Sequence, residues 1–302
     1  MTRIGHHAPL VGRACSTLLY GWYVHVGERL TNAAAGPSRG SLSPTSDSGT
    51  GSMTRALKHL IGPQAHLVSL FRTIRAVPYG LRLPIFGPVS TLNEILNIHD
   101  NFGKGELRHV EIERYLRQTA APVIVDCGVN VGITVRWWRH LNPQARVIGI
   151  DMMEEAHAFT KARLPGMADW YEPVTCALAA QPGLSMEISF DDPLLGENSV
   201  TSGPKAHKRR VVTATLDGAL LHQGVRQIDL LKIDIEGYGA EALKGAGNVL
   251  PMVRYVFFET HSRSETSEAA ALLHNAGFNL ISLRNRSFVY ENVAACRPSR
   301  RS

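Results

Sequence analysis

Short runs of apolar residues alternate with amphipathic segments between residues 122 and 292. The runs at 122–126 and 146–151 each end in an acidic residue and read as strands buried on both faces of a parallel sheet. The segments between the runs have the spacing of helices that cover such a sheet. The pattern predicts strands at 122–126, 146–151, 171–178, 184–190, 209–214, 228–234, 253–260, 278–283 and 287–292, and helices at 133–141, 153–164, 216–222, 239–248 and 264–276.

The order of these elements predicts an α/β fold with a doubly wound, mostly parallel sheet. The last two strands are separated by too few residues for a helix, so they should form an antiparallel hairpin at the C-terminal edge of the sheet. Upstream, helical spacing at 57–75, 91–99 and 106–118 predicts an N-terminal helical extension. Frequent Pro and Gly make 76–90 irregular in this interpretation.

Gly, Ser, Pro and Thr dominate residues 31–52, and such a composition cannot bury a core. We therefore expect 1–55 to be a flexible or disordered extension. Residues 1–52 should be dispensable for folding and cofactor binding, and Met53 is an alternative translation start. The other expected parts are a helical region at 56–118, a main domain at 119–296 and a basic tail at 297–302. No apolar run reaches the ~18 residues of a transmembrane helix, so we expect none.

The net charge of +6 comes from the two ends of the chain. Residues 1–55 carry five Arg against two acids and residues 297–302 carry three Arg, so the body between them is neutral. A neutral body argues against a nucleic-acid-binding face. The four cysteines, at positions 15, 127, 176 and 296, contain no CxxC pair, which argues against a zinc site or a redox motif. We expect free thiols and a reducing, cytoplasmic compartment.

A glycine-containing turn follows the first buried strand, in the segment VDCGVNVG at 125–132. Gly128 and Gly132 allow the backbone to approach a ligand closely, and Asn130 tolerates a left-handed conformation. The helix that starts behind the turn favours a carboxylate or phosphate at its N-terminus. The spacing GxNxG differs from the GxGxxG of dinucleotide-binding proteins. The turn alone therefore predicts a nucleotide-like cofactor of unspecified kind.

Two acids narrow the choice of cofactor. Asp151 ends the second strand, where a carboxylate can accept hydrogen bonds from both hydroxyls of a ribose, as in NAD or S-adenosylmethionine. Asp126 ends the first strand, where a carboxylate would repel a pyrophosphate but could accept a hydrogen bond from the ammonium of a methionine moiety. The pair favours S-adenosylmethionine over NAD.

Four segments together resemble the FkbM-type methyltransferases: VDCGVNVGIT at 125–134, TLDGALL at 215–221, IDLLKIDIEGYGAEALKGA at 228–246 and VFFETH at 256–261. The resemblance covers about 120–292. It implies the Rossmann-like fold of class I methyltransferases, S-adenosylmethionine as cofactor, and a hydroxylated small molecule such as a sugar or polyketide as methyl acceptor.

The chain departs from the family pattern at three places. Asp151-Met152 stands where the family usually has Glu-Pro, the turn beginning at Ala177 lacks the usual acid, and the acid after Gly237 is displaced to Glu241. We expect the cofactor to contact Asp126, Gly128, Asn130, Gly132, Asp151, Met152 and Ala177.

A second group of ionisable residues ends the strands at 228–234 and 253–260. Lys232 and Asp234 share one side of the first of these strands, Glu236 follows it, and Glu259 and His261 share one face at the end of the next. Ligands of open α/β sheets bind at this edge. We expect Asp234, Glu236 and His261 to be catalytic, with Asp234 or His261 taking a hydroxyl proton.

Two further interpretations of this second group stay open. A cation held by Asp, Glu and His side chains is the rival to a side-chain base, although we assign no metal ligands from the sequence. In a purely structural interpretation, Lys232 and Asp234 form a buried ion pair and Glu236 caps the helix near Gly239.

Four classes of function compete. A nucleic-acid methyltransferase is disfavoured because Asp234-Ile-Glu-Gly replaces the Asp/Asn-Pro-Pro-Tyr/Phe of adenine-amino enzymes, and no Pro-Cys dipeptide is present for cytosine methylation. An NAD-dependent oxidoreductase is disfavoured by the missing GxGxxG and by Asp126, and a non-catalytic binding module stays open. We predict O-methylation of a hydroxyl on a small molecule, and the sequence does not specify the oligomeric state.

Overall fold

The computed structural model describes residues 81–83, 85–103, 105–164, 169–194, 205–221, 223–284 and 286–295. The chain divides into two compact units, Met1–Lys104 and Gly105–Ser302. The helix expected at 57–75, the extension at 1–55 and the tail at 297–302 lie outside the described residues, and the domain boundaries drawn from the sequence stay predictions.

The described part of the first unit contains a strand pair and a helix. Strands β1 (Leu81–Leu83) and β2 (Gly87–Val89) pair antiparallel, so the expectation that 76–90 is irregular was wrong for these residues. Gly87 has a φ of 67°, a conformation that glycine adopts without strain where the chain reverses. Helix α3 (Leu92–Ile98) begins at a capping box between Thr91 and Glu94 and continues into a π-helical turn, η1 (His99–Gly103).

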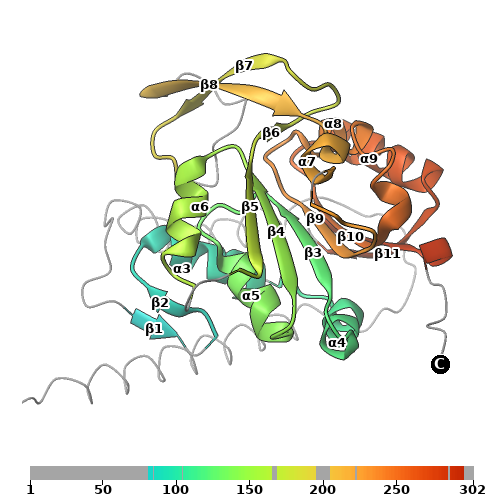
Figure 1. Ribbon diagram of the computed structural model, residues 1–302, viewed down its shortest axis with the longest axis horizontal. Coiled ribbons are helices and arrows are strands. Elements are labelled where there is room, and N and C mark those ends of the chain that lie inside the picture. The colour runs from blue at the N-terminus through green and yellow to red at the C-terminus, as the bar shows by residue number, and fades with distance from the viewer. Residues whose placement is uncertain are drawn as a thin grey trace, which may run out of the picture. The chain divides into compact units, whose positions relative to one another are not determined.

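The second unit is built around a seven-stranded sheet (Figure 1). The strand order is β11-β12-β10-β9-β3-β4-β5, and β12 runs antiparallel to both of its neighbours while the other strands are parallel. This is the order of a doubly wound sheet closed by a C-terminal hairpin, so the predicted fold class is confirmed. The strands are β3 (Val123–Cys127), β4 (Arg146–Asp151), β5 (Tyr171–Thr175), β9 (Ile228–Ile233), β10 (Val253–Glu259), β11 (Phe278–Arg284) and β12 (Ser287–Asn292).

Helices cover both faces of this sheet (Figure 1). One side carries α4 (Val110–Gln118), α5 (Ile133–Leu141) and α6 (Glu154–Lys161), and the other carries α7 (Leu216–Leu220), α8 (Gly239–Lys244) and α9 (Arg263–Asn275). Short helical turns, η2 (Leu250–Met252) and η3 (Val293–Ala295), precede β10 and follow β12. All six residues of β9 are buried, which explains its continuous apolar pattern. In the part of the chain that the structure describes, no helix has the length and apolarity to cross a bilayer.

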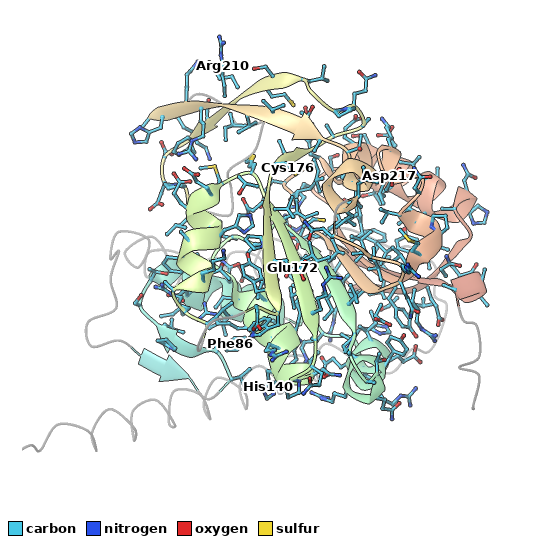
Figure 2. The ribbon with its side chains drawn as sticks, viewed as in Figure 1. Phe86, His140, Glu172, Cys176, Arg210 and Asp217 are labelled. Atoms are coloured by element: carbon cyan, nitrogen blue, oxygen red, sulfur yellow. The ribbon has the colours of Figure 1, made fainter. Side chains whose placement is uncertain are left out.

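The segment expected to be one strand at 171–178 is divided between two sheets. β5 ends at Thr175, and β6 (Ala177–Leu178) pairs instead with β8 (His207–Ala214), which also pairs with β7 (Ser185–Phe190). The chain changes sheets at Cys176, at the end of β5 nearest the three-stranded sheet (Figure 2). The single-strand prediction was therefore wrong, because an apolar run does not reveal which partner each residue pairs with.

Candidate functional site

The loop after β3 has an unusual backbone. Gly128, Asn130 and Gly132 have φ values of 87°, 50° and 68°, so three residues within a stretch of five take left-handed conformations. A Cβ at Gly128 would lie 1.9 Å from the backbone oxygen of Asp234, a distance that no side chain can occupy. Only glycine fits there, and the loop consequently lies against the chain that leaves β9.

Asp151 fixes the shape of this loop from the end of β4. One oxygen of its carboxylate accepts a hydrogen bond of 2.9 Å from the backbone N–H of Asn130, and the other accepts one of 2.9 Å from Met153. Burial raises the pKa of Asp151 in spite of these two hydrogen bonds. The side chain is only partly buried, so its remaining lone pairs can accept hydrogen bonds from a ligand.

An apolar cluster lies next to Asp151. Met152 packs against buried residues that include Met153 and Ala177, together with Ile188 and Phe190 of the β7–β8 hairpin. Met152 and Ala177, both predicted to contact the cofactor, therefore belong to one cluster. The carboxylate of Asp151, the glycine loop and this apolar cluster contain residues that the sequence predicts to contact the cofactor, and those contacts stay predictions.

Lys232 is a buried cation that contacts the glycine loop, Asp126 of the predicted cofactor site and Asp234 of the predicted catalytic site. Its side chain is 2% exposed, and its ammonium lies 3.2 Å from Asp126 and 3.4 Å from Asp234. It also donates a hydrogen bond of 2.7 Å to the backbone oxygen of Gly128. Burial disfavours the ammonium, but the two carboxylates outweigh that cost and raise the pKa of Lys232. The ion pair suggested by the structural interpretation is present, with Asp126 as a second partner.

Asp126 is fully buried and lies at the end of β3 that leads into the glycine loop. Besides Lys232, it accepts a hydrogen bond of 2.9 Å from the indole N–H of Trp138 in α5. The structure thus gives this carboxylate two protein partners, and its predicted contact with the cofactor ammonium stays a prediction.

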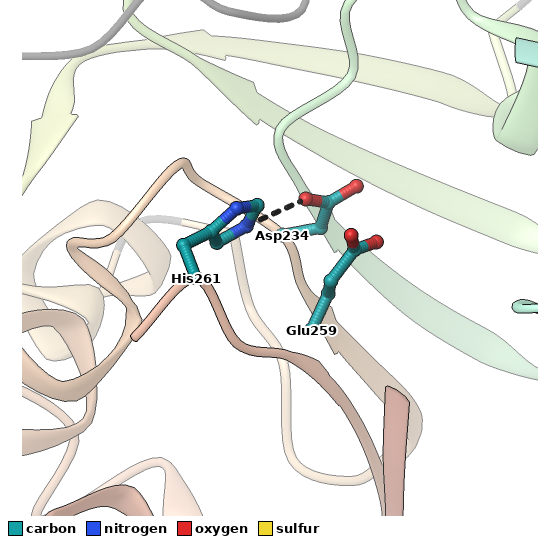
Figure 3. Close-up of side chains that lie close together, drawn as sticks. All are labelled: Asp234, Glu259 and His261. Carbon is teal, nitrogen blue, oxygen red and sulfur yellow. Dashed lines mark ion pairs between the residues drawn. The ribbon is translucent and has the colours of Figure 1, made fainter. Parts of the chain in front are cut away.

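The ends of β9 and β10 bring Asp234, Glu259 and His261 together (Figure 3), and Glu236 lies beside His261. His261 lies between two carboxylates, with its Nε2 3.5 Å from Asp234 and its Nδ1 3.3 Å from Glu236. Glu259 is the last residue of β10, and its carboxylate lies close to Asp234 and His261. The three residues predicted to be catalytic, Asp234, Glu236 and His261, are therefore neighbours. Glu236 has a φ of 48°, which makes it, with Asn130, one of two non-glycine residues with positive φ among those the structure describes.

The charges in this cluster shift one another's pKa. Burial would raise the pKa of Asp234, but Lys232 and His261 lower it to about 2. Burial and the Asp234 charge raise the pKa of Glu259 to about 8. Burial disfavours the imidazolium of His261, yet Asp234 and Glu236 raise its pKa. The cluster thus combines groups that hold and release protons over a wide pH range, as is common at active sites.

Glu265 is a site residue that the sequence analysis did not identify. It is buried and accepts hydrogen bonds from the backbone N–H groups of Gly239, at 2.9 Å, and His261, at 2.8 Å. Glu265 therefore accepts the hydrogen bond from the first N–H group of the helix at Gly239. The signal was present in the sequence, because Ser262 and Glu265 have the S-x-x-E spacing of a capping box and Ser262 caps α9.

Several known proteins resemble this chain. The methyltransferase sdnD of Sordaria araneosa is 25% identical over 193 residues, which are 53% of this chain and 74% of that protein. Among solved structures, the N-terminal domain of human METTL16 in complex with S-adenosylhomocysteine matches with a TM-score of 0.40 and 12% identity, covering 68% of this chain and 84% of that one. Aeropyrum pernix fibrillarin with bound S-adenosyl-L-methionine matches with a TM-score of 0.37 and 12% identity, covering 62% and 75%.

The family comparison is the decisive one. The model of the FkbM methyltransferase domain matches residues 126–280, just over half of the chain, from the end of β3 into β11. This range contains the glycine loop, Asp151 and the cluster at the ends of β9 and β10. The chain belongs to the FkbM methyltransferase family and uses S-adenosylmethionine as its methyl donor.

Proposed function

We propose that the protein transfers the methyl group of S-adenosylmethionine to a hydroxyl oxygen of a small molecule. The observation that carries the proposal is the cluster of Asp234, Glu236 and His261 beside the glycine loop. An aliphatic hydroxyl is a weak nucleophile at neutral pH, so an O-methyltransferase gains from groups that promote loss of its proton.

The transfer is an in-line displacement. A bond forms between the acceptor oxygen and the methyl carbon as the bond from that carbon to the sulfonium sulfur breaks, and the hydroxyl proton leaves to the cluster or to water. The protein contributes mainly by holding the two reactants in line. We assign Asp151 to the ribose hydroxyls, the loop at 128–132 to the methionine end of the cofactor, and the Asp234 cluster to the acceptor.

We also propose a small-molecule acceptor in place of a nucleic acid, and a cytoplasmic location. The neutral body of the chain supports the first proposal, since binding of nucleic acid depends on clustered positive charge. The unpaired thiols of Cys127 and Cys176 support the second, because reducing compartments keep thiols free.

Two measurements test the proposed function. Calorimetry of the full chain with S-adenosylmethionine and, separately, with NAD should give saturable binding of the first alone. Turnover against a panel of hydroxylated sugars and polyketides should then give S-adenosylhomocysteine and a methyl ether. Glu187→Gln is the control variant, because Glu187 is an exposed acid on β7 that pairs with Lys208 of the same hairpin. Binding of NAD in place of S-adenosylmethionine, or methylation of nitrogen only, would overturn the proposal.

A further inference from the structure

We propose that Asp234, Glu259 and His261 bind a divalent cation, which holds the acceptor hydroxyl and promotes loss of its proton. This inference rests on the proposed function and identifies how the acceptor is activated. It replaces the expectation that a side chain acts alone as the base.

The positions of the ligand atoms support a cation site. One oxygen or nitrogen from each of the three side chains lies within 4.8 Å of the other two, and no other such group of three occurs among the described residues (Figure 3). Two atoms bound to one cation at about 2.1 Å each can be at most about 4.2 Å apart. Asp234 and His261, at 3.5 Å, already satisfy this limit, and small side-chain rotations would bring in Glu259.

The candidate ligands also lie at the ends of two strands of the sheet. β9 and β10 are adjacent parallel strands in the middle of the sheet, where Ile233 pairs with Phe258. Asp234 follows Ile233 directly, Glu259 follows Phe258, and His261 is held by its backbone hydrogen bond to Glu265. Sites on strand ends keep their ligands in place better than sites on long loops.

The orientation of His261 is an independent indication of a cation. Its Nδ1 faces Glu236 at 3.3 Å, while its buried Nε2 faces Asp234 at 3.5 Å without a well-formed hydrogen bond. A histidine that ligates a metal generally donates its other ring N–H to a carboxylate, which fixes the tautomer and points the free nitrogen at the metal. Glu236 would have that role here.

The charges around His261 favour an additional cation. Three carboxylates, those of Asp234, Glu236 and Glu259, surround one imidazole. Lys232 pairs with one oxygen of Asp234, and Arg286 pairs with one oxygen of Glu259 at 3.1 Å, so each acid keeps its second oxygen as a candidate ligand. The Arg286 side chain is 60% exposed, and water screens its charge.

The ligand set indicates the kind of cation. Two carboxylates favour Mg²⁺ or Mn²⁺, and an imidazole favours the first-row transition metals, so Mn²⁺ suits the mixed set. Three protein ligands leave positions open for the acceptor hydroxyl and water. A hydroxyl bound to the cation loses its proton to water more readily, and the resulting alkoxide attacks the methyl carbon.

Binding of Mn²⁺ to the full chain tests the proposal without reference to activity. After treatment with a chelator and its removal, Mn²⁺ would be titrated in the presence and absence of S-adenosylmethionine and followed by electron paramagnetic resonance. We expect saturable binding of one ion. Asp234→Asn and Glu259→Gln should weaken it more than about 100-fold, and Glu236→Gln by about 10- to 100-fold. Glu187→Gln, on the exposed hairpin, should bind as the unaltered chain does.

The outcomes separate this proposal from the proposed function. The cation site would be overturned if the chain did not bind Mn²⁺, or if Glu259→Gln and Glu187→Gln bound it equally well. Thermal melting of the variants, and Glu259→Asp as a variant that keeps the carboxylate, are the controls for folding. Methyl transfer that continues at full rate in a chelator would overturn the role of the cation and leave a side chain as the base. Failure to bind S-adenosylmethionine would instead overturn the proposed function, whatever the result with Mn²⁺.

Discussion

The Lys232→Met substitution tests whether one buried ammonium holds the site together. Lys232 is 2% exposed and lies 3.2 Å from Asp126 and 3.4 Å from Asp234. Methionine matches its length but carries no charge, so the substitution leaves Asp126, which is fully buried, without a counter-charge. It also removes the hydrogen bond to the backbone oxygen of Gly128.

The expected loss of stability is large. Removing one partner of a buried ion pair costs about 3–5 kcal/mol, because the other charge stays buried without compensation. For a domain of this size each kcal/mol lowers the melting temperature by about 2–4 °C, so the loss corresponds to about 6–20 °C. Urea denaturation followed by circular dichroism, alongside thermal melting, would measure both quantities.

Two further variants make the test specific. Lys244→Met removes a lysine that also lies between two acids, Glu241 at 2.5 Å and Glu268 at 2.7 Å, but on the surface, where an ion pair contributes about 0–1 kcal/mol. The double variant Lys232→Met/Asp126→Asn should lose less free energy of unfolding than the two single variants together, because it no longer buries the charge of Asp126 without a partner. A loss below about 1 kcal/mol for Lys232→Met, or strict additivity in the double variant, would refute the reasoning.

Three further predictions concern the cofactor loop and its surroundings. Asp151→Ala should weaken binding of S-adenosylmethionine about 10- to 100-fold in calorimetry, as expected for loss of a charge-assisted hydrogen bond, and unchanged affinity would contradict the ribose assignment. Gly128→Ala should destabilise the fold by more than the ~1–3 kcal/mol of backbone strain, whereas Gly183→Ala, with a similar φ of 80° but open space around it, should cost strain alone. Burial lowers the pKa of His157, so its contribution to stability should be complete above pH ~6.5 and decline as the pH falls below it, since the unfolded chain then binds more protons. Denaturation between pH 8 and 5 should show a weaker decline in His157→Gln, and identical slopes would refute the prediction.

The fold was predictable from the sequence to the extent that it depends on buried strands. β3, β4 and β9 carry continuous apolar runs because both of their faces are covered, and each run predicted its strand to within a residue or two. The partners with which the strands pair were harder to predict. Nothing in the run at 171–178 indicates that the pairing in one sheet ends at Thr175 and that Ala177 begins another.

The candidate site shows a similar limit. The alternation of side chains along a strand placed Lys232 with Asp234, and Glu259 with His261, on one face. It could not show that Lys232 also reaches Asp126, because that contact depends on the register of β9 against β3, where Asp126 pairs with Lys232. It likewise could not show which nitrogen of His261 faces Glu236, since that depends on how the loop after β9 turns.

The central claim is methyl transfer to a hydroxyl oxygen, and the fate of a labelled methyl group tests it most directly. The full chain would be incubated with S-adenosylmethionine labelled with ¹³C in its methyl group, a panel of hydroxylated small molecules, and RNA as a competing acceptor, and the products would be examined by nuclear magnetic resonance. We predict a ¹³C signal from a methyl ether on a small molecule, with S-adenosylhomocysteine formed in equal amount. Label on nitrogen or carbon, or label recovered only in the RNA, would contradict the account.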